Sequence, residues 1–353
     1  SMESQAIRAK QYIGSTAGII LIAIGVPGLV LPILQGWLFI AIGTVLLSMF
    51  CPPVGRRVAK VKGRYPFAAL YIDRAEDQVE QFFRRTHRRK RIKIMLPNGK
   101  RLCAIYDECK RDSRGIAVIL HGLGGYKEQP LVRALGDSVA DIGYSTLRFD
   151  TQNGVGESDG RYSFATTTGM LSDLSDVMEY VKALSAFNEQ GVILMGHSLG
   201  GLCVLEYTAQ HPSRVSVVVV AGPVISGALS KQAIVEFRPD EWESWQRAGH
   251  RADQVATREP YNRLPFTHIV DRMEYDMLPK ATLLSMPVLL LVGEKDENTP
   301  LSHVRQLLER LPEGKGELVV LPGAAHTINT HADVALVKAS IRRFIEEYFN
   351  PSV

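Results

Sequence analysis

The residues best suited to chemistry lie in the stretch Gly-His-Ser-Leu-Gly, residues 196–200. An apolar run, residues 192–195, leads into this stretch, and a helical pattern begins directly after it. A serine on such a tight strand–helix turn needs neighbours without side chains two residues away, and Gly196 and Gly200 meet that need. The N-terminus of the following helix favours negative charge beside the serine. The sequence therefore predicts a nucleophilic hydroxyl at Ser198.

Two further residues are expected to activate this serine, because a hydroxyl is a weak nucleophile at neutral pH without a base in hydrogen-bond reach. His326 fits the role of base, since it lies in a loop of small residues after the last predicted strand. An acid that orients the base is expected on the loop at residues 293–300, after another predicted strand. There Asp296 is favoured over Glu294 and Glu297, because it lies three residues after the glycine and four before the proline.

A glycine-rich stretch, residues 121–125, follows the predicted strand 116–120. Glycines allow the backbone to turn so that an N–H group points inward. We assign the oxyanion hole to the amides of Leu123 and Leu199, the latter being the residue after the serine. The alternative is a plain turn. Together these residues predict acyl transfer by serine, with no metal or organic cofactor required.

The elements that must position these residues alternate along the chain. From residue 116 onward, apolar strand patterns and helical patterns follow one another, which predicts a mostly parallel sheet covered by helices on both faces, with the site at the strand carboxyl ends. An Asn-Gly turn at 98–99 joins two earlier strands as a hairpin. The aromatic-rich segment at about 225–285 is interpreted as a helical cap, whose aromatic residues line an acyl pocket or form the core of the cap itself. The predicted strands are 91–96, 101–106, 116–120, 145–149, 192–195, 215–221, 287–292 and 317–321, and the predicted helices are 131–142, 166–187, 200–210, 302–311 and 333–349.

These motifs together resemble the α/β-hydrolase superfamily over residues 92–349. The pattern is similar to the esterase, monoacylglycerol-lipase and serine-aminopeptidase-like branch, and particularly to cinnamoyl and feruloyl esterases. The resemblance implies an α/β-hydrolase fold with its catalytic residues in the order Ser198, Asp296, His326. One departure is the stretch Thr151-Gln152-Asn153, where the branch usually has an arginine before the glycine; in that family this segment is structural. The matching pieces are HGLGG at 121–125, FD at 149–150, GVGESDG at 154–160, GHSLGG at 196–201, VGEKDENTP at 292–300 and the Ala-His pair at 325–326.

The N-terminal region has a different character, since residues 11–55 contain no Asp, Glu, Lys, Arg or His. This stretch is too long for the apolar region of a secretory signal, and too long for one membrane span of about 20 residues. Prolines and glycines near 27–32 interrupt it. We therefore predict a transmembrane or re-entrant helical hairpin over residues 1–55. Each arm is short for a core of about 30 Å, so a shallow hairpin stays open, and a buried soluble helical hairpin is the alternative.

Charge is distributed unevenly along the 353-residue chain, whose net charge is +4. Between Arg56 and Lys93 there are thirteen Lys or Arg and four Asp or Glu, whereas residues 94–353 carry a net −6. We predict a basic amphipathic juxtamembrane neck over residues 56–91 that contacts membrane lipids, the alternative being a solvated charge run. Positive residues flank both ends of the hairpin, so both ends should face the cytoplasm. Nucleic acid is not expected as a partner, because no recognised motif accompanies the basic residues.

The sequence thus predicts a catalytic domain over residues 92–353, attached to the inner (cytoplasmic) membrane and facing the cytoplasm. The expected function is hydrolysis of lipid-like or aromatic carboxylic esters through an acyl-enzyme. A thioesterase or an amidase or peptidase would use the same residues. A non-catalytic interaction module displayed on a membrane hairpin is a further alternative, and a homo-oligomer formed through the hairpin and neck stays open.

Overall fold

The computed structural model describes residues 11, 14–23, 36–83, 86–110, 113–188, 191–255 and 262–349. The chain divides into two compact units, Ser1–Arg85 and Thr86–Val353. This division falls before the boundary expected after residue 91, because strand β1 already begins at His87 and pairs with β2 along its whole length. The C-terminal unit therefore contains much of the basic run that the sequence places in the neck.

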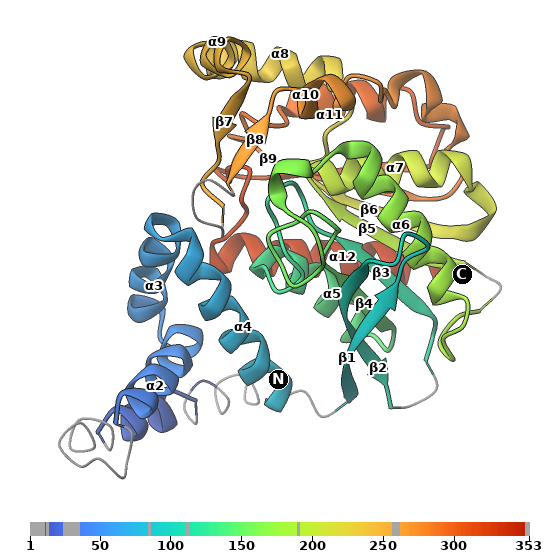
Figure 1. Ribbon diagram of the computed structural model, residues 1–353. Helices are drawn as coiled ribbons and strands as arrows, with labels where there is room; N and C mark the ends of the chain where they lie inside the picture. The colour runs from blue at the N-terminus through green and yellow to red at the C-terminus, as the bar shows by residue number, and fades with distance from the viewer. Residues whose placement is uncertain are drawn as a thin grey trace. The chain divides into compact units, whose positions relative to one another are not determined.

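The C-terminal unit is built on one eight-stranded sheet, in the order β1-β2-β4-β3-β5-β6-β9-β10 (Figure 1). β1 pairs antiparallel with β2, and β2 with β4, while every other pairing in this sheet is parallel. The predicted mostly parallel sheet is thus confirmed. Its strands are β1 (His87–Met95), β2 (Arg101–Cys109), β3 (Ile116–Leu120), β4 (Ser145–Phe149), β5 (Val192–His197), β6 (Val215–Ala221), β9 (Val288–Gly293) and β10 (Gly316–Leu321).

Helices cover both faces of this sheet, because the central strands are apolar on both sides and must bury both. Every residue of β3, β4 and β9 is buried. One face packs against α6, α7 and α11, and the other against α5 and α12. Each fully buried Leu, Val or Ile contributes about 1.5–3 kcal/mol of transfer free energy. The covering helices are α5 (Pro130–Ala140), α6 (Thr167–Val181), α7 (Leu199–Gln210), α11 (Leu301–Leu308) and α12 (His331–Phe349), and short 3₁₀ helices lie at η1 (Tyr162–Phe164) and η2 (Pro212–Arg214).

A cap is inserted between β6 and β9, where the sequence analysis expects one. Trp245 is only 1 % exposed, donates its indole N–H to the Leu264 carbonyl at 3.0 Å, and contacts the ring of Phe266 at 5.6 Å. Trp242 contacts the same ring at 5.3 Å. These three aromatic residues therefore form a core within the cap. Its elements are α8 (Gly227–Phe237), α9 (Pro239–Ala248), the hairpin β7 (His250–Ala252) and β8 (Arg263–Pro265), α10 (Thr267–Arg272) and η3 (Leu278–Leu283).

The N-terminal unit consists of helices in the part that the structure describes. Residues 14–23 are helical and lie against α2, because a Cβ added to Gly43 would come within 2.7 Å of the Gly18 carbonyl oxygen. Two prolines begin α3 directly after α2, which stops the preceding helix. Lys62 joins α3 to α4 through ion pairs at 2.7 and 2.6 Å to two carboxylates of α4, those of Asp73 and Glu76. The helices are α2 (Gly36–Phe50), α3 (Pro52–Arg64) and α4 (Pro66–Phe83).

Among the described residues, none of the helices combines the length and the apolar character that crossing a membrane requires. Helix α2 has 15 residues and would extend about 22 Å, short of a hydrocarbon core of about 30 Å. The expected transmembrane hairpin is therefore not found in this part of the chain. Its expected Pro/Gly turn, at residues 27–32, lies outside the described residues.

Candidate active site

Ser198 stands at the turn between β5 and α7, with the unusual backbone angles φ +55° and ψ −120°. A residue with a side chain rarely adopts positive φ, and the strain is of the order of 1–3 kcal/mol. The close packing of this turn explains its glycines. A Cβ on Gly196 would lie 2.6 Å from the Gly200 carbonyl oxygen, and a Cβ on Gly200 would overlap the His121 carbonyl oxygen. These close contacts thus hold Ser198 on a tight turn just beyond the end of β5.

The structure brings together the three side chains that the sequence analysis selects. Ser198 Oγ lies 2.9 Å from His326 Nε2, and His326 Nδ1 lies 2.8 Å from Asp296 Oδ2. With the ring proton on Nδ1 directed at the carboxylate, Nε2 is left to accept the serine proton. The competing carboxylates, Glu294 and Glu297, are both exposed. The geometry therefore favours Asp296 as the acid that orients His326.

Asp296 is buried and fully hydrogen-bonded. Its Oδ1 accepts the backbone N–H groups of Asn298 at 2.9 Å and Thr299 at 2.8 Å, and its Oδ2 also accepts the Thr299 hydroxyl. Burial by itself raises the pKa of Asp296, but His326 and these donors outweigh it, so the pKa is lowered from its usual value. The carboxylate therefore stays ionised at neutral pH and can stabilise a protonated His326.

The glycine-rich stretch at 121–125 lies against the serine. A Cβ added to Gly122 would come within 2.9 Å of Ser198 Cβ. In the part of the chain that the structure describes, the N–H groups of Leu123 and Leu199 make no loop or turn hydrogen bond, and Leu199 is the first residue of α7, whose N–H has no partner within the helix. Both amides are thus available for an oxyanion, and their assignment to the oxyanion hole stays a prediction.

Comparison with known proteins agrees with this architecture. The family described as serine aminopeptidase, S33, matches residues 111–264. Mitochondrial palmitoyl-protein thioesterase ABHD10 of Mus musculus is 23% identical over 245 residues, which cover 69% of this chain and 78% of the relative. A monoacylglycerol lipase of Mycolicibacterium smegmatis is 25% identical over 260 residues, covering 66% of this chain and 89% of the relative. Est1E from Butyrivibrio proteoclasticus, solved with ferulic acid bound, superimposes with a TM-score of 0.62 at 22% identity, covering 73% of this chain and 99% of that one.

The chain is an α/β hydrolase. Mouse ABHD10 itself superimposes with a TM-score of 0.59 at 21% identity, covering 73% of this chain and 99% of that structure. The relatives are named as a lipase and thioesterases and the matching family as a serine aminopeptidase, and the protein is an enzyme of the serine-hydrolase class. The predicted superfamily is therefore confirmed.

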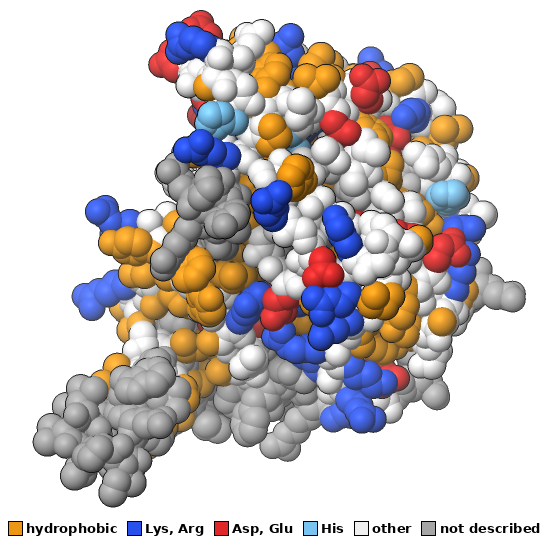
Figure 2. All heavy atoms as spheres, viewed as in Figure 1, with side chains coloured by type: hydrophobic (Ala, Val, Ile, Leu, Met, Phe, Trp, Pro, Cys, Tyr) orange, Lys and Arg blue, Asp and Glu red, His pale blue; other side chains and the backbone are white. Residues whose placement is uncertain are grey.

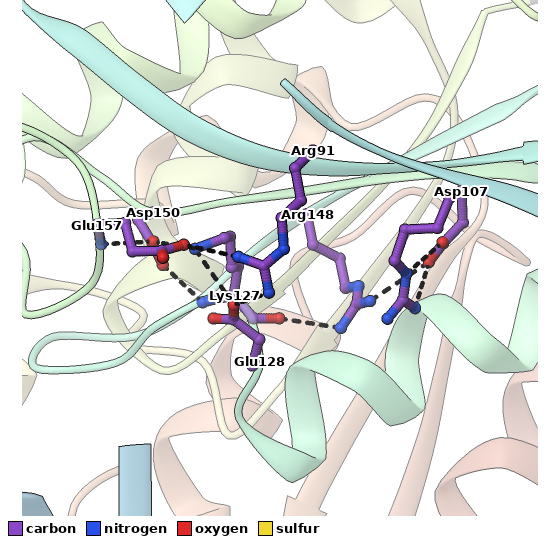
Figure 3. A network of polar contacts seen from close by, with 8 residues as sticks. Arg91, Asp107, Lys127, Glu128, Arg148, Asp150 and Glu157 are labelled. Carbon is purple, nitrogen blue, oxygen red and sulfur yellow. Dashed lines mark hydrogen bonds and ion pairs between the residues drawn. The ribbon is translucent and has the colours of Figure 1, made fainter. Parts of the chain in front are cut away.

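In this hydrolase, a buried ion cluster holds the glycine-rich stretch at its far end (Figure 3). Lys127 donates its backbone N–H to Asp150 Oδ1 at 2.8 Å, and its Nζ lies 2.6 Å from both Asp150 Oδ2 and Glu157 Oε2. Arg148 donates to the Lys127 carbonyl at 3.1 Å. The Lys127 side chain is 1 % exposed. The cluster thus ties Lys127, two residues after the glycine-rich stretch, to Asp150 at the end of β4 and to Glu157.

His121 holds the near end of the same stretch. Its Nδ1 donates to the Gly122 carbonyl at 2.7 Å, and its Nε2 accepts the Thr151 backbone N–H at 3.1 Å. Burial lowers the pKa of His121 more strongly than Asp150 raises it, so the ring is neutral and can accept at Nε2. Both ends of the candidate oxyanion loop are therefore held by buried polar contacts.

His197, which sequence reasoning missed, lies between the serine and the histidine loop. Its Nε2 lies 3.3 Å from the backbone oxygen of His326, and the two imidazole rings are 5.0 Å apart. Burial first, and then the neighbouring His326, lower the pKa of His197 to about 3. A neutral His197 can donate to this carbonyl and so help to position His326. The Gly-x-Ser-x-Gly pattern specifies no residue at the position before the serine, so the pattern gives no signal for this role.

In the ranges that the structure describes, no three His, Cys, Asp or Glu side chains are grouped so that they could hold a metal ion.

Proposed function

We propose that this hydrolase cleaves carboxylic esters with lipid-like or aromatic acyl groups, through an acyl-enzyme on Ser198. The hydrogen-bonded series from Ser198 through His326 to Asp296 carries the proposal. Ser198 Oγ attacks the ester carbonyl carbon while His326 Nε2 takes its proton, and the amides of Leu123 and Leu199 receive the oxyanion. The bond to the alcohol oxygen then breaks as His326 returns the proton to the alcohol. Water repeats these steps, with His326 again the base, and releases the acid.

The relatives support an ester and leave two other acyl substrates to test. One relative is a monoacylglycerol lipase, and one similar structure contains ferulic acid, which fits lipid-like and aromatic acyl groups. Other relatives carry the name palmitoyl-protein thioesterase, and the matching family is described as serine aminopeptidase. A thioester or an amide would be cleaved by the same residues with a different leaving group. The ester is our first candidate and the thioester our second.

The catalytic assignment is tested by labelling with a fluorophosphonate, which reacts with an activated serine. We expect wild-type protein to label, and Ser198→Ala to lose the label and at least about 10⁴-fold in hydrolysis of a nitrophenyl ester. Ser302→Ala, which removes an exposed hydroxyl on α11, serves as the matched control and should keep both. Wild-type protein that neither labels nor turns over would refute the proposal and favour a non-catalytic interaction module.

The substrate class is tested with a matched series of esters, thioesters and anilides of increasing acyl length, together with a hydroxycinnamate ester. Ester kcat/KM that rises with acyl length supports a lipid-like substrate, and a maximum at the hydroxycinnamate supports an aromatic one. A labelled serine with turnover confined to thioesters or anilides would replace the ester by that bond and leave the acyl-enzyme mechanism in place.

We also propose that the protein is attached to a membrane, with its catalytic unit in the cytoplasm, through a shallow hairpin formed by the uncharged stretch 11–55. Ile19 and Ile20 are 60% and 52% exposed and Ile42 is 39% exposed, so the described helices present apolar side chains outward. Small residues, such as Gly18 and Gly43, bring the two helices together, as is common for helices packed in lipid. The full-length chain is expected to remain with membranes after an alkaline carbonate wash, and its release into the supernatant would refute this attachment.

A further inference from the structure

Helix α3 presents an unusual surface, since its thirteen residues include five Lys or Arg and no acidic residue. One of the five, Lys62, is used inside the N-terminal unit, where it pairs with Asp73 and Glu76 of α4. The other four are exposed, and no ion pair to any of them occurs among the residues that the structure describes. They are Arg56, Arg57, Lys60 and Arg64.

These four cations share one face of the helix. At about 100° of rotation per residue, they fall within an arc of roughly 100°, and Lys62 lies on the opposite side. Because Lys62 contacts α4, the cationic face points away from α4. We call this surface the α3 face.

Exposed apolar and aromatic side chains adjoin the α3 face. Val61 is 44% exposed, and Tyr65, the residue after α3, is 55% exposed. The Arg64 guanidinium lies 5.8 Å from the centre of the Tyr65 ring. Figure 2 shows blue and orange side chains next to one another along the left edge, where Figure 1 draws α3. The surface therefore combines fixed positive charge with side chains that favour a boundary between water and lipid.

The basic run farther along the chain is less suited to such a role. Residues 87–91 belong to β1, where Arg89 pairs with Asp107 at 2.7 Å and Lys90 pairs with Glu108 at 2.7 Å. Arg91 likewise lies 3.0 Å from Glu157. Arg89, Lys90 and Arg91 are thus paired within the C-terminal unit, whereas the four cations of the α3 face have no ion pair among the described residues.

We propose that the α3 face lies on a bilayer surface and binds the anionic headgroups of phospholipids. α3 follows directly on α2, whose sequence is uncharged, so a hairpin dipping into one leaflet would place α3 at the headgroup level. Each of four cations near an anionic surface increases partitioning onto that surface about fivefold, while Val61 and Tyr65 supply contacts that do not depend on charge. Bases of single-stranded RNA stack on aromatic rings, so Tyr65 alone does not separate the two partners. The exposed aliphatic Val61 and the uncharged helix α2 next to α3 favour lipid.

The test measures partitioning of the full-length chain, kept dispersed in dilute non-ionic detergent, onto vesicles of phosphatidylcholine alone or mixed with phosphatidylglycerol. One variant replaces the four α3-face cations by Gln: Arg56→Gln, Arg57→Gln, Lys60→Gln and Arg64→Gln. The matched control replaces four exposed cations of the C-terminal unit: Lys93→Gln, Arg247→Gln, Arg305→Gln and Arg310→Gln. Circular dichroism and nitrophenyl-ester hydrolysis check that each variant folds.

Wild-type protein is expected to prefer the phosphatidylglycerol vesicles by roughly 100- to 600-fold, and the α3 variant to lose most of that preference while the control keeps it. Raising NaCl from about 0.15 M to about 1 M shortens the screening length from about 8 Å to about 3 Å and should abolish the preference in wild type too. Val61→Ser with Tyr65→Ser should weaken binding to both kinds of vesicle by the same factor.

If the α3 variant and the control lose the preference for phosphatidylglycerol vesicles equally, the proposal is refuted, because the total positive charge of the protein would then explain that preference. So would a wild type that binds both vesicles equally, or one that prefers single-stranded RNA to phosphatidylglycerol vesicles. The inference rests on the proposed membrane attachment and not on the ester chemistry. Inactive protein that still prefers anionic vesicles would count only against the proposed hydrolysis.

Discussion

Asp150 and Asp173 are two buried carboxylates of the catalytic unit, and they titrate in opposite directions. They are 0 % and 4 % exposed, and both accept backbone N–H groups, including that of Glu157 for Asp150 and that of Gln152 for Asp173. Burial is the largest influence on each, and it raises both pKa values. At Asp150 the nearby Lys127 reverses the sign, so its pKa is lowered, whereas the pKa of Asp173 rises to about 7. A buried carboxylate near this site therefore stays charged because of a cation, since backbone donors alone are not sufficient.

The largest effect that we expect comes from removing the Lys127 cation. Without it, the pKa of Asp150 should be raised by burial, as that of Asp173 is. Lys127→Met leaves a buried charge without its partner, which typically costs about 3–5 kcal/mol of unfolding free energy. Because Lys127 also ties the chain just after the glycine-rich stretch to Asp150, ester kcat should fall as well. Urea unfolding and steady-state kinetics measure the two losses. The exposed Lys100→Met is the control, and a loss of stability no greater than in that control would contradict the comparison.

Asp173 tests the other half of the comparison. Its folded pKa of about 7 lies above the unfolded value of about 3.9, so the folded state holds a proton that the unfolded state releases between these pH values. Stability attributable to Asp173 is therefore present at low pH and is lost as pH rises from about 4 to about 7, by up to about 4 kcal/mol. Asp173→Asn should remove this loss. The unfolding free energy of the variant, relative to that of wild type, should therefore increase as pH rises from about 4 to about 7. Unfolding free energies measured at several pH values should show the gain, and parallel curves for the two proteins would rule it out.

His197 extends the comparison to a third buried group, one whose pKa of about 3 keeps it neutral. Its contact with the His326 carbonyl is 3.3 Å long, and a hydrogen bond of this kind is worth about 1 kcal/mol. His197→Phe should therefore lower kcat roughly five- to tenfold with little change in KM. His197→Gln keeps a donor and should recover part of the loss. Equal kcat in the two variants would mean that the ring acts only by filling space.

Much of the fold of the catalytic unit can be predicted from the local pattern of apolar residues in the sequence. β3, β4 and β6 have the predicted bounds, because strands buried on both faces read as short apolar runs between turns. The three side chains predicted to act together are brought together for a related reason, since each follows a parallel strand and such strand ends meet at one edge of a sheet. Their catalytic roles stay a prediction that the labelling experiment addresses.

The features that escaped prediction depend on partners distant in the chain. β1 begins at His87, inside a run of Arg and Lys that does not look like a strand, and it is stabilised by Asp107 and Glu108 on the strand opposite. Lys127 and Asp150 are 23 positions apart, with helix α5 and the whole of strand β4 between them. Such pairings cannot be predicted from the periodicity or composition of a short stretch of sequence. The same holds for the short cap hairpin β7–β8.

The backbone of Ser198 also bears on how this protein could be engineered. Its φ of +55° is costly for any residue with a Cβ and nearly free for glycine. A search for stabilising substitutions that ignored turnover would therefore select glycine at this position and discard the proposed nucleophile. A serine at this position is explained by activity and not by stability. Position 198 is therefore a place where stability and activity make opposite demands on the residue.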